Sequence, residues 1–165
     1  MKKDPVKLVV ALLFAAYFGW CAFDPHRWHF IDGVNLLIHE AGHVVFMPFG
    51  EFVSVAGGSL FQLIVPAAFA AYFFRRAQPF SGALVLFWLG QSMLNVAVYA
   101  GDALALELPL IGGEDSLHDW NYMLDSLGML KSTRAVAGLI RLCGTAIIVA
   151  AGLSAYRFSE TKGRA

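Results

Sequence analysis

Residues 30–49 read FIDGVNLLIHEAGHVVFMPF, an apolar stretch that contains the motif His39-Glu40-Ala41-Gly42-His43. Its length is about the 20 residues that a helix needs to cross a bilayer. Residues four apart lie on one face of a helix, so His39 and His43 can bind one metal ion with Glu40 beside it. In soluble metalloproteases this spacing supplies two zinc ligands and the general base. Ionisable groups are costly in a membrane span, so we interpret these three as a functional site.

The composition indicates an integral membrane protein. Of the 165 residues, 58% are hydrophobic and 15% are charged, whereas soluble domains carry roughly 25% charged residues. We expect one membrane-embedded domain over residues 1–165, in a multi-pass protein of the cell inner membrane that contacts membrane lipid. The formal net charge is zero, so the sequence gives no case for a nucleic-acid partner.

Apolar segments of about membrane length recur along the chain. They cover residues 6–23, 30–49, 57–74, 80–100 and 135–156. Backbone that faces lipid must satisfy its own hydrogen bonds, so these segments are expected to be helices. The sequence therefore predicts an all-α bundle of about five transmembrane helices.

Two regions between the apolar segments depart from this pattern. Residues 50–58 are rich in glycine and alternate in character, which predicts a tight turn or a short re-entrant segment. A re-entrant segment is tolerated only where protein or water covers it. Residues 117–130 form a pattern too polar to span, and we expect a helix there that lies at the interface or folds into the bundle.

A catalytic zinc site needs a third protein ligand and an open position for water. His118 is the first choice because it lies in an acid-rich segment and is followed by a carboxylate. Asp119 is the second choice and Asp125 the third, either as ligand or as a group that orients a ligand. The alternative for His118 is a solvated histidine at the membrane interface. Zinc is the expected cofactor.

A polar stripe in residues 80–100 predicts a cavity near the metal. Gln91, Asn95 and Tyr99 recur every four residues and so share one helical face. These groups can hold the backbone of a substrate or polarise its carbonyl. The alternative is that they form hydrogen bonds between helices.

The placement of the motif in a membrane helix resembles the site-2-protease type of intramembrane zinc metalloprotease. This resemblance rests on His39, Glu40 and His43, and it implies that the histidines bind zinc and the glutamate activates water. It also implies a third ligand from a distant Leu-Asp-Gly motif, for which the nearest match is Leu124-Asp125-Ser126. The family cleaves membrane-embedded or membrane-proximal peptide bonds, so a membrane-protein or peptide substrate is expected.

Three functions are consistent with these patterns. The first is a membrane-embedded zinc-dependent hydrolase, and in particular a peptidase that uses metal-activated water. The second is a non-catalytic membrane protein in which the metal is structural, sensed or carried, and it expects a closed site of four ligands. The third is a membrane scaffold in which the motif is vestigial.

Overall fold

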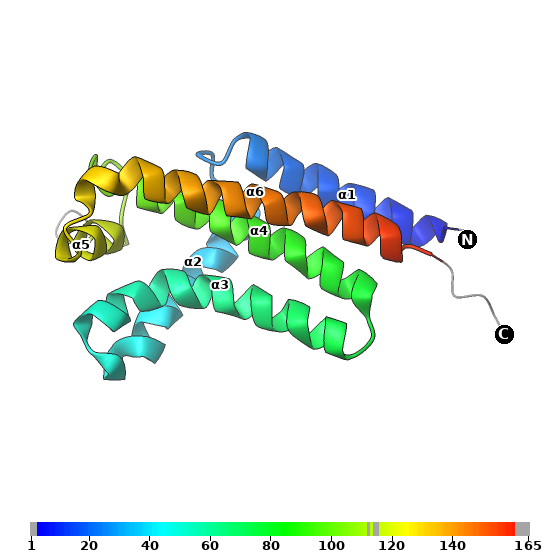
Figure 1. The fold of residues 1–165 in the computed structure, drawn as a ribbon, viewed down its shortest axis with the longest axis horizontal. Coiled ribbons are helices and arrows are strands. Elements are labelled where there is room, and N and C mark those ends of the chain that lie inside the picture. The colour runs from blue at the N-terminus through cyan, green and yellow to red at the C-terminus, as the bar shows by residue number, and fades with distance from the viewer. Residues whose placement is uncertain (1–2, 112, 114–115, 161–165) are drawn as a thin grey trace.

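The computed structural model describes residues 3–111, 113 and 116–160, and its regular elements are helices (Figure 1). A fold built from helices agrees with the all-α prediction. The α-helices and the two short 3-10 helices are α1 (Pro5–Phe23), α2 (Phe30–Phe46), η1 (Met47–Phe49), α3 (Glu51–Arg75), α4 (Pro79–Gly101), α5 (Asp119–Ser126), η2 (Leu130–Ser132) and α6 (Thr133–Phe158).

Four helices of the described part are long and apolar enough to cross a membrane: α1, α3, α4, and α6 together with η2. All four run along the long axis of the molecule in Figure 1. The remaining apolar segment, expected as a fifth span over 30–49, forms the 17-residue α2 and then the turn η1. The expected count of about five spans is therefore not confirmed. The difference lies in α2, which is short and carries Asp32 and Glu40.

Within the glycine-rich segment 50–58, residues 51–58 are helical, and the expected re-entrant segment is not confirmed. Only Gly50 has a turn conformation, with a φ of 97°, and α3 begins at the next residue, Glu51. The other glycines serve close packing, since a Cβ added to Gly57 would lie 2.8 Å from the carbonyl oxygen of Gly42. Small residues allow two helix backbones to approach in this way, so α2 crosses α3 at this point.

The core lies between α1, α4 and α6. The rings of Phe18 and Phe87 stack there with their centroids 5.7 Å apart. The most extensive packing joins α4 to α6, and these helices cross closely at Gly90 and Gly144. A Cβ on Gly144 would lie 2.8 Å from the Gly90 carbonyl oxygen. Helix α4 of this closely packed pair also bonds to α2, which carries the motif.

The polar segment 117–130 contains a short, non-spanning helix, as predicted, although its bounds are narrower. Helix α5 begins at Asp119 because the His118 side chain accepts a hydrogen bond from the Asn121 N–H at its first turn. The chain leaves this region through Gly128, whose φ of 66° suits glycine. Helix α5 contacts α3 and α4 and so lies at the end of the bundle (Figure 1).

Candidate metal centre

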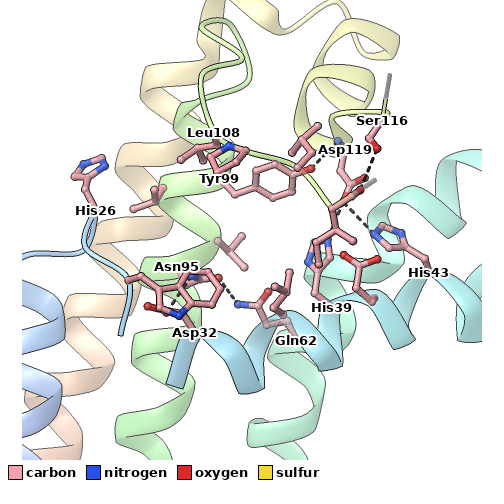
Figure 2. Close-up of a pocket in the computed structure, with 18 of the residues that line it drawn as sticks. His26, Asp32, His39, His43, Gln62, Asn95, Tyr99, Leu108, Ser116 and Asp119 are labelled. Atoms are coloured by element: carbon pink, nitrogen blue, oxygen red, sulfur yellow. Dashed lines mark hydrogen bonds and ion pairs between the residues drawn. The ribbon is translucent and has the colours of Figure 1, made fainter. Parts of the chain in front are cut away.

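His39, His43 and Asp119 come together although they belong to two helices far apart in the sequence (Figure 2). The Oδ2 atom of Asp119 lies 2.9 Å from His39 Nε2 and 3.3 Å from His43 Nε2. Each residue offers one ligand atom, and these atoms lie within 4.8 Å of one another. His39 and Asp119 are buried, and His43 is half-buried. Two imidazoles and a carboxylate therefore converge on one point.

The orientation of His43 is fixed by the first turn of α3. Its Nδ1 lies 2.9 Å from the carbonyl oxygen of Ser54, so Nδ1 carries the proton and donates it there. The Ser54 hydroxyl in turn donates to the backbone carbonyl of His43 at 3.0 Å. The other ring nitrogen, Nε2, is left to face Asp119. Histidine ligands of metals are commonly held by such a bond from the other ring nitrogen.

Asp119 is positioned by contacts between α5 and its neighbours. Its backbone N–H donates to the hydroxyl of Tyr99 at 3.1 Å, and the indole N–H of Trp120 donates to the Ser59 hydroxyl at 3.1 Å. Burial raises the pKa of the Asp119 carboxyl, but hydrogen bonds from His39 and His43 outweigh this effect and leave the pKa below its usual value. The ionised form, which a metal ligand requires, is therefore favoured.

Gly58 provides the space that the two imidazole rings occupy. A Cβ at this position would lie 2.5 Å from His39 Nε2 and 2.7 Å from His43 Cε1. Both distances are well below van der Waals contact. The glycine in α3 therefore allows both rings to stay in the arrangement that faces Asp119.

The other two predicted third ligands lie outside this group. His118 Nε2 donates to the Asp102 carboxylate at 3.2 Å, while its Nδ1 accepts the Asn121 N–H. Both ring nitrogens are therefore engaged away from the motif. Asp125 is exposed near the end of α5. The structure thus brings Asp119, the second choice from the sequence, to His39 and His43 in place of His118.

A cavity of about 640 Å³ opens onto the three converging groups. Glu40 also lines this cavity, and its side chain is exposed there. Of the polar stripe predicted on α4, Asn95 and Tyr99 line the cavity. Gln91 is instead buried between helices, where its amide bonds to neighbouring side chains. The stripe therefore combines both interpretations that the sequence left open.

Asp32 and Asn35 form a buried polar group that the sequence analysis did not single out. The Oδ1 atom of Asp32 accepts hydrogen bonds from Gln91 Nε2 at 2.7 Å and Asn95 Nδ2 at 3.1 Å. Asn35 Nδ2 donates to Gln91 Oε1 at 2.7 Å. A signal was present, because positions 32, 35, 39 and 43 fall on one face of a helix. That polar face extends the histidine pair by two turns.

Comparisons with protein-family models, curated proteins and solved structures give no match. The function is therefore inferred from the site itself. The relevant features are the converging ligand atoms of His39, His43 and Asp119, and the exposed carboxylate of Glu40 in the same cavity.

Proposed function

We propose that this protein is a membrane-embedded, zinc-dependent hydrolase of the multi-pass type in the cell inner membrane. We further propose that it is a peptidase, similar to the site-2-protease type, which cleaves membrane or membrane-proximal peptide bonds. The observation that carries the proposal is the convergence of His39, His43 and Asp119 on one cavity that Glu40 also lines.

The donor set fits zinc. Imidazole nitrogen and carboxylate oxygen are both common zinc ligands, and two ligands about 2.1 Å from a tetrahedral ion lie about 3.4 Å apart. The Asp119 oxygen is 2.9 Å and 3.3 Å from the two histidine nitrogens, which is close to that spacing. Among the described residues the group has three members. Three protein ligands are typical of catalytic zinc, whereas structural zinc has four.

The protein's own groups can carry the remaining steps of hydrolysis. A zinc ion held here would lower the pKa of a water molecule and polarise a carbonyl. The Glu40 carboxylate can take the proton from the attacking water and then deliver it to the leaving amine. The Tyr99 hydroxyl accepts the Asp119 N–H, so its own proton is available to donate to the substrate carbonyl oxygen.

The test compares Glu40→Gln with Glu51→Gln in detergent micelles. Glu51 is exposed at the start of α3 and lies outside the cavity, so its variant is the matched control. We expect both variants to keep about one zinc by elemental analysis. Cleavage of a panel of fluorogenic apolar peptides should fall about 100-fold or more in Glu40→Gln only. Unchanged turnover in that variant would refute the role of Glu40.

A further inference from the structure

The buried Asp32 carboxylate sets the direction of the hydrogen bonds around it. Only 4% of Asp32 is exposed. Its Oδ1 atom contacts the amide groups of Gln91 and Asn95. A carboxylate accepts hydrogen bonds and does not donate them, so both amides must turn their NH₂ groups toward it. The Asn95 carbonyl oxygen, Oδ1, must therefore point away from Asp32.

The orientation of the Asn95 amide in turn fixes the orientation of the Gln62 amide on α3. The oxygen Asn95 Oδ1 accepts from Gln62 Nε2 at 2.8 Å, and Nε2 also donates to the backbone carbonyl of Ser92 at 3.3 Å. Rotating the Gln62 amide would place its oxygen against two acceptors. Its orientation is thus determined by Asp32 through Asn95, and both of its N–H groups are used.

Among the described residues, this arrangement leaves the Gln62 Oε1 atom as an acceptor without a donor. No hydrogen bond between described residues uses Oε1, although Gln62 is only 2% exposed and lines the 640 Å³ cavity. Oε1 is not among the fully enclosed polar atoms that lack a partner in the described residues, so it keeps access to the cavity. A ligand in the cavity that brings a hydrogen-bond donor can pair with it.

Gln62 is close to the candidate metal centre. It follows Gly58 by one turn of α3, and Gly58 contacts the rings of His39 and His43. Residues four apart on a helix share a face and are about 6 Å apart along its axis. In the view of Figure 2 the Gln62 side chain lies between Asn95 and His39. Gln62 therefore lines the same cavity as the three converging groups, on the face of α3 that also carries Gly58.

We propose that Gln62 is a specificity-determining residue, whose Oε1 accepts a hydrogen bond from a backbone N–H of a peptide bound in the cavity. The inference rests on the proposed function and names the feature by which the site recognises a peptide backbone. The Tyr99 hydroxyl, which lines the same cavity, supplies a donor for a carbonyl oxygen. An ester linkage lacks the N–H and would set an oxygen against Oε1, so it should bind less well.

The experiment measures binding of two probes to the zinc-loaded protein in micelles. One probe is acetyl-leucyl-leucine hydroxamate, and the other has an ester oxygen in place of the N–H between the leucines. We expect the wild type to bind the amide probe about tenfold more tightly by calorimetry. Gln62→Met should bind both equally. Gln91→Met is the matched control, because its amide belongs to the same network but lies outside the cavity, and it should keep the preference.

The outcomes separate this inference from the proposed function. Equal binding of the two probes by the wild type would overturn the role of Gln62 and leave the hydrolase standing. A tenfold preference that persists in Gln62→Met would do the same. Failure of both hydroxamates to bind would overturn the metal site and the inference together. If Gln62→Met does not fold, the wild-type comparison still decides.

Discussion

The Oδ2 atom of Asp119 lies 2.9 Å from His39 Nε2, although 80 positions separate the two residues in the chain. This contact joins α5, a helix that does not span, to α2 in the bundle. His43 approaches the same oxygen at 3.3 Å. The candidate centre is therefore completed by the docking of α5 on α3 and α4 and is not contained in the helix that carries the motif.

Replacing Asp119 should remove metal binding, whereas replacing His118 should only weaken it. Groups that support a metal ligand typically contribute 10–100-fold to affinity, so loss of a ligand should cost about 100-fold or more. His118→Asn keeps a side chain able to cap α5 and should lower zinc affinity about tenfold or less. Zinc affinity of Asp119→Ala and His118→Asn can be measured by competition with a chromogenic chelator.

The ranking of these two variants is the decisive result. If His118→Asn loses more zinc affinity than Asp119→Ala, then His118 and not Asp119 is the third metal ligand. In that case α5 does not present Asp119 to the histidine pair as described. Circular dichroism of both variants would show that the helices are retained.

The sequence could predict His39, Glu40 and His43 as a unit because their relation depends only on the periodicity of one helix. The choice between His118 and Asp119 depends on where α5 begins. Consecutive residues on a helix point in directions about 100° apart. His118 is the cap residue and turns to Asp102, so Asp119 faces α2. The local cap sets that start, but the face that α5 turns toward α2 depends on the bonds from Asp119 to Tyr99 and from Trp120 to Ser59, which no local pattern contains.

The prediction of a turn or re-entrant segment over 50–58 is met only by the turn at Gly50, for a related reason. Glycine is common in turns, and the sequence does not say whether a glycine serves a turn or a close helix crossing. Gly50 serves a turn, while Gly57 and Gly58 lie inside α3 and make room for α2. The crossing partner, Gly42, could have been suspected because it lies within the motif itself.

Gly58→Ala should disturb the candidate metal centre more than the fold. The added Cβ would collide with the His39 and His43 rings, which must rotate away from Asp119. Alanine is a better helix former than glycine, so α3 itself should remain helical. We expect zinc affinity to fall about tenfold or more, as measured by chelator competition.

Gly19→Ala is the matched control for this substitution. Gly19 lies in α1, and a Cβ there would meet no atom of the described residues within 4 Å. Its variant should bind zinc as the wild type does. Equal zinc affinities of Gly58→Ala and Gly19→Ala would mean that the two imidazoles do not share a ligand site beside α3.

Asp32→Asn should destabilise the junction of α2 and α4, because no orientation of the new amide satisfies its neighbours. The Oδ1 atom of Asp32 accepts from Gln91 and Asn95, and Oδ2 accepts from the His29 N–H at 2.7 Å. An asparagine has one oxygen and one NH₂ group, so its NH₂ must face either the two side-chain amides or the His29 N–H. Both of these are donors and cannot pair with it. Leaving buried donors unpaired costs about 1–3 kcal/mol, which denaturant unfolding in micelles can measure. Asp24→Asn, at an exposed loop position, is the control and should unfold as the wild type does. If Asp32→Asn is as stable as that control, the carboxylate does not set the direction of the network, and the assigned orientation of Gln62 loses its basis.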